Sequence, residues 1–354
     1  MEDLALNPSF WNAKRVLVTG HTGFKGGWLA IWLQRLGANV AGFALPASTE
    51  PNFFAAAGVA NTLQSEIGDI RDLDHLVQFV SSYRPEIIIH MAAQSLVRRS
   101  YADPIETFTS NVMGTVNLLE AARRCDSVAG VVNVTTDKCY ENLEREAGYR
   151  EDEPLGGHDP YSSSKGCAEL VTSSYRRSYS LPVASARAGN VIGGGDWAED
   201  RLIPDMVRSF MSGKAAGIRN PASTRPWQHV LEPLHGYLAL AEQVCKEPAS
   251  YAEAWNFGPD DADAKPVEWL ADQLCTLWSN GASWSNTGDS EQLHEAGFLR
   301  LNCEKAKQRL GWYPRLKLEQ ALSWTVDWYK SYRAGDNVRT VTESQISSFE
   351  TGRV

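Results

Sequence analysis

The residues best suited to chemistry follow an apolar, β-branched run at positions 131–140, VVNVTTDKCY. The run predicts a buried strand that ends in two hydroxyls, a carboxylate and an amine, from Thr135, Thr136, Asp137 and Lys138. Ligands of open α/β sheets bind in the crevice beyond the carboxyl ends of the strands. We therefore expect these four side chains to project into such a crevice.

A tyrosine and a lysine, Tyr161 and Lys165, open a predicted helix further along the chain. Positions i and i+4 share a helix face, so the phenol and the amine point into one space. A nearby ammonium favours the phenolate and would draw the pKa of Tyr161 toward the value that a general base needs. A YxxxK pattern by itself is usually a solvated helix face. Its place after a hydroxyl-bearing strand end favours a functional pair.

A glycine-rich turn near the N-terminus predicts dinucleotide binding. An apolar run at residues 15–19 meets Gly20, Gly23 and Gly26, and an amphipathic helix pattern follows until Gly37. Glycines let the backbone approach a diphosphate, and the helix N-terminus offers N–H groups and a positive dipole end. A purely structural turn is the alternative, but the strand–turn–helix context favours a cofactor.

Alternating strand and helix patterns predict an α/β fold with a Rossmann-type, doubly wound parallel sheet. Strands are expected at residues 15–19, 40–45, 86–91, 131–134, 183–186 and 255–257, with a short one closing at 68–70. Helices are expected at residues 73–83, 104–125, 161–180 and 231–246. These elements bring the polar strand ends to one edge of the sheet.

The regular alternation stops after a glycine-rich loop at residues 193–197, where we place a change of domain. Residues 1–187 and about 230–257 are expected to form the dinucleotide-binding Rossmann domain. Residues about 188–229 and 258–335 are expected to form a smaller mixed α/β lobe. The polar tail at residues 336–354 is expected to be loosely ordered.

Other strand ends supply further candidate cofactor contacts. Asp69 could accept a hydrogen bond from an adenine amino group, although capping of the next helix explains it equally well. The end of the second strand offers no acid for a ribose hydroxyl and no arginine for a 2′-phosphate, so it does not decide between NAD and NADP. The expected cofactor contacts are Gly20, Thr22, Gly23, Phe24, Gly26, Asp69, Ile70, Ala92, Ala93, Gln94, Asn111, Thr135, Tyr161 and Lys165.

Composition narrows the class of partner. The formal net charge of −9 argues against binding to nucleic-acid phosphates or an acidic membrane, so a small molecule is expected. The six cysteines lack CxxC or Cys/His metal spacing, which predicts reduced thiols, a cytoplasmic location and no metal. No stretch reaches the roughly 18 uninterrupted apolar residues of a membrane span, and no apolar export segment opens the chain.

Arginines of the second lobe could bind a diphosphate in this acidic protein, because guanidinium groups suit bidentate recognition. Arg219, Arg225 and Arg300 are the candidates. A surface ion pair is the simpler role for any one of them. Arg225, beside Pro226 and Trp227 and before a predicted helix, is the one for which we favour a ligand role.

Read in order, GHTGFKG, MAAQS, TTD and YSSSK resemble the extended short-chain dehydrogenase/reductase family over nearly the whole chain. GHTGFKGGW, TTDKCY, GGGDWAEDRLIPD, RPWQHVLEPL and HEA at 294–296 resemble its nucleotide-sugar branch, most closely the 4,6-dehydratases of CDP-glucose. The resemblance implies tightly bound NAD, CDP-glucose as substrate, a role in deoxysugar (lipopolysaccharide) biosynthesis, and a homodimer or dimer of dimers. It implies substrate contacts from Ser95, Arg187, Asn190, Arg201, Leu202, Arg219, Arg225, Trp227, His229 and Arg300.

The resemblance also implies roles in catalysis. Tyr161 would take the sugar 4-hydroxyl proton, with Lys165 beside it and Thr136 hydrogen-bonded to the same oxygen. Asp137 would be the acid for the C6 hydroxyl. Lys138 stands where the commoner deoxythymidine-diphosphate branch has a glutamate as the C5 base, and it could act so only if burial and Lys165 lower its pKa. The alternative is a surface lysine or a phosphate ligand.

Two other functions stay open at this point. A nucleotide-sugar 4-epimerase would use Tyr161 and Lys165 but needs no acid/base pair after Thr136, because it removes no water. A non-catalytic dinucleotide-binding regulatory protein would need no Tyr–Lys pair. The Asp137–Lys138 pair therefore favours a dehydratase.

Overall fold

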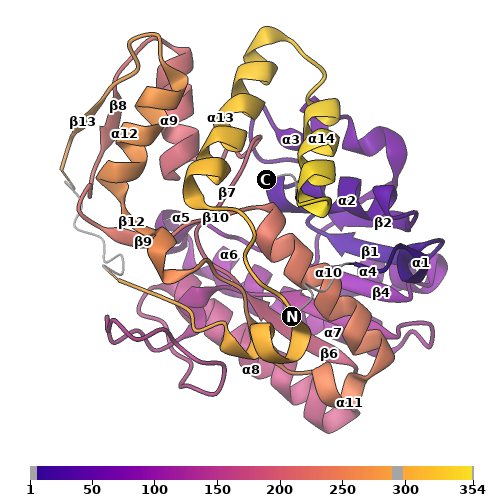
Figure 1. The fold of residues 1–354 in the computed structure, drawn as a ribbon. Coiled ribbons are helices and arrows are strands. Elements are labelled where there is room, and N and C mark those ends of the chain that lie inside the picture. Colours follow the sequence, from indigo (N-terminus) through magenta and orange to yellow (C-terminus); the bar gives the residue numbers. More distant parts are fainter. Residues whose placement is uncertain (1–5, 289–297, 353–354) are drawn as a thin grey trace.

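A seven-stranded sheet forms the centre of the computed structural model, which describes residues 6–288 and 298–352 (Figure 1). The strand order is β11-β6-β5-β4-β1-β2-β3, and neighbouring strands are parallel. The bounds are β1 Arg15–Thr19, β2 Asn39–Ala44, β3 Gln64–Ile67, β4 Ile87–His90, β5 Gly130–Val134, β6 Val183–Arg187 and β11 Ala254–Asn256. The predicted Rossmann-type doubly wound sheet is confirmed.

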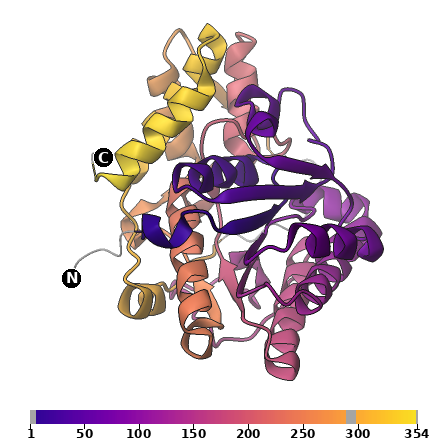
Figure 2. The ribbon, with the colours of Figure 1, turned by 90° about the vertical axis from the view of Figure 1, so that its right-hand side faces the viewer.

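Helices cover both faces of the sheet because side chains alternate across each strand. Leu17 of β1 packs into one core cluster with residues of α4 (Leu73–Tyr83) and α7 (Gly114–Arg123). Val16 and Val18 point the other way, into a larger cluster with residues of α2 (Phe24–Arg35) and α10 (Leu231–Lys246). The strands lie between these two helix layers, as the turned view of Figure 2 shows. α8 (Pro160–Tyr179) lies beside α7 and completes the layer of α4 and α7.

Small sheets and helices lie outside the main sheet; we refer to them as the second lobe, and its bounds as a separate domain stay a prediction. β8 (Ala216–Ile218) pairs with β13 (Trp284–Asn286), and β9 (Thr224–Pro226) pairs with β12 (Ala264–Pro266). β7 (Val191–Ile192) pairs with β10 (Gln228–His229), and α9 (Leu202–Met211), α12 (Val267–Trp278) and α13 (Leu318–Ala334) complete the region. The short elements are α1 Pro8–Trp11, α3 Phe53–Ala56, η1 Val59–Thr62, α5 Val97–Ala102, α6 Pro104–Phe108, η2 Thr109–Met113, η3 Asp137–Cys139, α11 Pro248–Tyr251, η4 Asp261–Asp263 and η5 Ala306–Leu310. The HEA motif at 294–296 lies outside the described residues.

The polar C-terminal tail is a helix, so the expectation of loose order is wrong. α14 (Val338–Glu350) packs against α13 and α2, and Figure 1 shows these three helices side by side. Its buried side chains recur every three or four residues, which is the stripe of an amphipathic helix: Val338, Thr342, Gln345, Ile346 and Phe349. Two bonds tie its end to α2, because Glu350 accepts from Trp32 Nε1 at 2.7 Å and pairs with Arg35 at 3.2 Å. The prediction failed because it considered the polar composition of the tail and not the spacing of its few apolar residues.

No helix in residues 6–288 and 298–352 is long and apolar enough to cross a membrane. The same residues contain no group of three or more His, Cys, Asp or Glu side chains placed to hold a metal ion.

Replacing Phe349 by alanine should destabilise the whole protein. The ring is fully buried and contacts Trp32 and His235 edge-on, with centroids 5.7 and 5.8 Å apart. We expect Phe349→Ala to lower the free energy of unfolding by about 3–5 kcal/mol in urea denaturation, because it leaves a cavity. Ser344→Ala, on the exposed side of α14, is the matched control and should change it by less than about 0.5 kcal/mol. Equal effects of the two substitutions would contradict a packed tail.

Candidate active site

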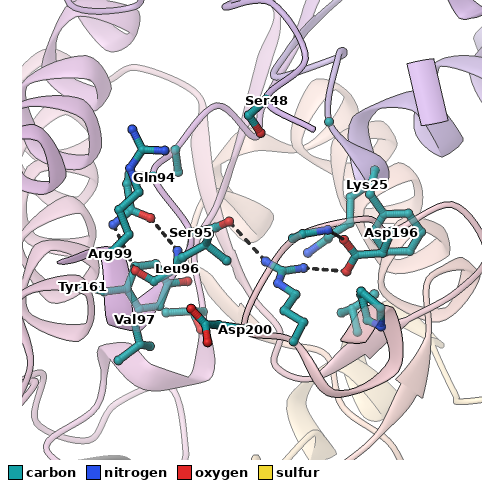
Figure 3. A pocket seen from close by; sticks show the side chains of 18 of the residues that line it. Lys25, Ser48, Gln94, Ser95, Leu96, Val97, Arg99, Tyr161, Asp196 and Asp200 are labelled. Atoms are coloured by element: carbon teal, nitrogen blue, oxygen red, sulfur yellow. Dashed lines mark hydrogen bonds and ion pairs between the residues drawn. The ribbon is translucent and has the colours of Figure 1, made fainter. Parts of the chain in front are cut away.

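A cavity of about 900 Å³ lies at the carboxyl edge of the sheet. Its walls include residues that directly follow β1, β2, β3, β4, β5 and β6, together with side chains of the second lobe. Figure 3 shows side chains from both sides reaching into it. All of the site residues predicted from the sequence line this cavity, except Asn111, Arg187, His229 and Arg300.

The glycine-rich turn has the shape of a diphosphate cradle. Gly20 has φ +77°, and a Cβ there would lie 2.8 Å from the Ala92 nitrogen. A Cβ on Gly26 would overlap the Gly20 carbonyl, whereas Gly23 has room for one. The N-terminal N–H groups of α2, which starts after its N-cap Gly23, lie beside this surface. These residues fit a dinucleotide, whose diphosphate needs a close backbone and unpaired N–H donors.

Asp69 is not the cap of the following helix. Asp72 caps α4 by accepting from the His75 nitrogen at 3.1 Å, so capping of this helix does not explain Asp69. Asp69 instead lines the cavity, and its Oδ1 accepts a hydrogen bond from Arg71 Nε at 3.0 Å. The hydrogen bonds from Arg71 lower the pKa of Asp69 and keep it an acceptor.

Asn111 lies behind the cavity wall. The predicted continuous helix 104–125 is broken by a π-helical segment, η2, that carries this residue. Its Oδ1 accepts from the Gln94 nitrogen, and its Nδ2 donates to the Gln94 carbonyl and the Ser164 hydroxyl, each at 2.9 Å. Its expected direct cofactor contact is therefore corrected: Asn111 fixes the backbone at Gln94, which does line the cavity.

The Tyr161–Lys165 pair enters the cavity at the start of α8. Asp159 caps that helix, and Pro160 occupies its first turn. Lys165 Nζ donates to the Val134 carbonyl at 3.3 Å, and burial lowers its pKa to about 8. Burial raises the pKa of Tyr161 to about 12 against the lowering effects of the Thr136 hydrogen bond and Arg201. The expected net shift of the Tyr161 pKa toward neutrality is therefore reversed by burial.

Asp137 is a buried carboxyl group beside Tyr161. β5 ends at Val134, and Thr136 caps the short turn η3 by accepting from the Lys138 nitrogen at 3.3 Å. Thr136 Oγ1 donates to Asp137 Oδ1 at 2.9 Å, while Oδ2 is buried without a hydrogen-bond partner. Burial raises the pKa of Asp137, as the sequence analysis required for an acid. Lys138 also lines the cavity, and its role as a base stays a prediction.

Arg187 does not reach the cavity, which corrects its expected contact with substrate. It is 3% exposed and pairs with Glu169 at 2.8 Å. Glu169 also accepts from the hydroxyls of Thr135 and Ser185, at 2.5 and 2.7 Å. Arg187 and Glu169 therefore hold the end of β5 from behind.

His229 and Arg300 also lie away from the cavity. His229 is fully buried, edge-on to the rings of Trp28 and Trp324 with centroids 5.9 and 5.7 Å apart. Arg300 lines a separate small hollow, with its guanidinium 4.8 Å from the Phe298 ring centroid and 3.8 Å from Asp261. Neither fits the expected substrate contact in this arrangement.

Two cavity residues, Lys25 and Asp196, were missed by the sequence analysis. Asp196 pairs with Arg201 at 3.0 Å, and Arg201 also donates to Ser95 at 3.1 Å, which links the second lobe to the end of β4 (Figure 3). Lys25 points into the cavity from α2. The charged residues inside the two glycine-rich segments, GFKGG and GGGDW, were the available signals.

Residues 17–325 match the protein-family model described as GDP-mannose 4,6 dehydratase. The chain belongs to this family. The predicted membership of the extended short-chain dehydrogenase/reductases, in their nucleotide-sugar branch, is thereby confirmed. The family includes enzymes that act on different nucleotide sugars, as its relatives show.

The chain is 51% identical to CDP-glucose 4,6-dehydratase of Salmonella typhimurium, over 97% of this chain and 98% of that protein. It is 29% identical to dTDP-glucose 4,6-dehydratase of Streptomyces griseus, over 90% of this chain and 95% of that protein. Among solved structures, a dTDP-glucose 4,6-dehydratase from Streptomyces venezuelae with NAD and TYD bound superposes with a TM-score of 0.77, at 26% identity over 92% of this chain and 99% of that chain. An epimerase from Methanothermobacter thermautotrophicus shares the fold, with a TM-score of 0.81 at 24% identity, over 93% of this chain and 95% of that chain.

Proposed function

We propose that this protein is a lyase that converts CDP-D-glucose to CDP-4-dehydro-6-deoxy-D-glucose and water, with NAD regenerated in each cycle. The observation that carries the proposal is the buried Asp137 carboxyl, which lies beside Tyr161 and Thr136 in the cavity. An acid at this place serves the removal of water. The 51% identity to CDP-glucose 4,6-dehydratase supports this substrate, and deoxysugar biosynthesis is the corresponding role.

Tyr161 and Thr136 act at the C4 hydroxyl in this proposal. Tyr161, as phenolate, accepts the hydroxyl proton, and Thr136 hydrogen-bonds the same oxygen. NAD, when bound, would supply a hydride acceptor for C4 oxidation and the hydride for reduction at C6. Gly20, Gly26 and the N-terminus of α2 would hold its diphosphate, and Lys165 lies at the end of β5 where the chemistry occurs.

Asp137 and Lys138 carry the elimination. Oxidation at C4 makes the C5 hydrogen acidic, and we assign Lys138 as the group that removes this proton and gives a proton back to C5 when hydride reaches C6. Asp137 gives its proton to the departing C6 hydroxyl, which leaves as water. Burial suits Asp137 for this step, because a raised pKa keeps the carboxyl protonated at higher pH.

The two rival functions are less well supported. A 4-epimerase would share this fold, as the similarity to the Methanothermobacter protein illustrates, but would not use Asp137, whose pKa burial raises, as an acid. A non-catalytic dinucleotide-binding protein would not need Tyr161, Asp137 and Lys165 gathered in one cavity. Localisation in the cytoplasm stays a prediction from the cysteine pattern.

The substrate is tested by offering CDP-, UDP-, GDP- and dTDP-glucose to the purified protein. We expect turnover to be fastest with CDP-glucose and to give a 4-keto sugar with a C6 methyl group, detected by NMR. No net change in NAD should accompany the reaction. A product inverted at C4, or no reaction with any of the four, would sink the proposed activity.

Three substitutions separate the redox step from the elimination. Tyr161→Phe should prevent C4 oxidation, so no reduced nicotinamide absorbance should appear after mixing with CDP-glucose. Asp137→Asn and Lys138→Met should still allow that absorbance to appear but should slow water loss by about 10²–10⁴-fold. Lys214→Met removes an exposed lysine and is the control for Lys138→Met. Equal loss of both steps in Lys138→Met would count against its assignment as the base.

We also propose a homodimer through the face of α6, η2 and α8. This face exposes apolar side chains, including Ile105, which is 74% exposed, and Leu170, which is 61% exposed. Clustered exposed apolar residues are typical of interfaces. Leu170→Glu should shift the protein toward monomer in sedimentation velocity. Leu143→Glu, at a loop position that is 69% exposed, should not, and a wild-type monomer would refute the dimer.

A further inference from the structure

Lys25 has a position in the cavity that the proposed reaction leaves without a role. It lies in the first turn of α2, directly after the glycine-rich turn, and its side chain lines the cavity. Its Nζ donates to the Tyr237 hydroxyl at 3.3 Å and lies 5.4 Å from the centroid of that ring. In Figure 3, Lys25 lies on the same side of the cavity as Asp196, across from Tyr161 and Gln94.

The charges around Lys25 leave its ammonium poorly compensated. Burial, and then the nearby cations Arg201 and Lys165, lower the pKa of Lys25 to about 7. The facing carboxyls, Asp137 and Asp196, act in the opposite direction.

Neither of these carboxyls forms an ion pair with Lys25 in the described residues, although Asp137 Oδ2 is buried without a hydrogen-bond partner. Asp196 pairs with Arg201, and Asp137 accepts from Thr136. Lys25 itself forms no salt bridge with any residue in 6–288 or 298–352. An ammonium has three donors, so two remain for a ligand.

We propose that Lys25 binds the diphosphate of the dinucleotide held by the glycine-rich turn. The helix N-terminus supplies N–H groups and a partial positive charge, and Lys25 adds a full charge from the first turn of the same helix. The diphosphate supplies the counter-charge that Lys25 lacks. The nucleotide sugar also has a diphosphate, but the cavity arginines Arg219 and Arg225 of the second lobe are the candidates for that group. The inference rests on the dinucleotide binding of the proposed function. It adds Lys25 as a contact of the diphosphate and predicts that binding is linked to uptake of a proton.

Binding of the diphosphate at Lys25 should depend on pH in a definite direction. Because the free amine has a pKa of about 7, it is largely neutral at pH 8. Bound diphosphate favours the ammonium and raises this pKa. Binding above pH 7 therefore takes up a proton, and affinity falls as the pH rises from 7 to the pKa of the complex.

The test measures binding to the nucleotide-free full chain by titration calorimetry, without turnover. The probes are NAD, ADP-ribose, which keeps the diphosphate but lacks nicotinamide, and CDP. We expect Lys25→Met to weaken NAD and ADP-ribose alike by about 10- to 100-fold, the loss of one charge-assisted hydrogen bond, and to leave CDP unchanged. Lys25→Arg should restore part of the affinity, and Lys214→Met should match wild type. A thermal melt without ligand checks that each variant is folded.

Titrations at pH 8 in buffers of different ionisation enthalpy give the proton count. Wild type should take up most of one proton more than Lys25→Met on binding ADP-ribose. Weakening of NAD alone would place Lys25 at the nicotinamide, and weakening of CDP would place it at the sugar nucleotide; either overturns the proposal, as does unchanged binding of all three. Failure of wild type to bind NAD or ADP-ribose would instead refute the cofactor itself.

Discussion

The buried pair of Arg187 and Glu169 is the interaction on which the catalytic geometry depends. It joins the end of β6 to α8, and its carboxylate also receives the hydroxyl of Thr135 at the end of β5. Thr136 and Asp137 follow directly, so their direction is fixed by this clamp. Removing one partner of a buried pair typically costs about 3–5 kcal/mol, because the other charge is left uncompensated. An ion pair that does not line the cavity therefore fixes the position of the residues after β5 that do line it.

Burial prepares the groups inside the cavity for proton transfer. It raises the pKa of Asp137 and of Tyr161 and lowers that of Lys165, so burial favours the neutral form of each group. For Asp137, the neutral form is the one that an acid needs. For Tyr161, the phenolate requires positive charge nearby, and Arg201 already lowers the pKa of the phenol against the effect of burial.

The family fold explains why a dehydratase and an epimerase are hard to separate by shape. The sheet, the glycine-rich turn and the Tyr–Lys pair serve C4 oxidation in the proposed mechanism of either. The difference lies in the few residues after β5, where Asp137 adds an acid to Thr136. The second lobe contacts the end of β4 at the same cavity through Arg201, which donates to Ser95. Small changes at one strand end can thus redirect a shared redox step.

The sequence alone determined the strand–turn–helix at Gly20–Gly26, the polar end of β5 and the Tyr161–Lys165 pair, because local spacing and periodicity encode them. The tertiary structure decided what depends on distant partners and on burial. In the folded protein, Arg187 forms an ion pair with Glu169 behind the cavity wall. The C-terminal helix packs on Trp32 through the ring of Phe349. The tertiary structure also turned Lys25 into the cavity and reversed the expected shift of the Tyr161 pKa. Exclusion of water and contacts between residues distant in the sequence set these positions and pKa shifts, and a local sequence pattern encodes neither.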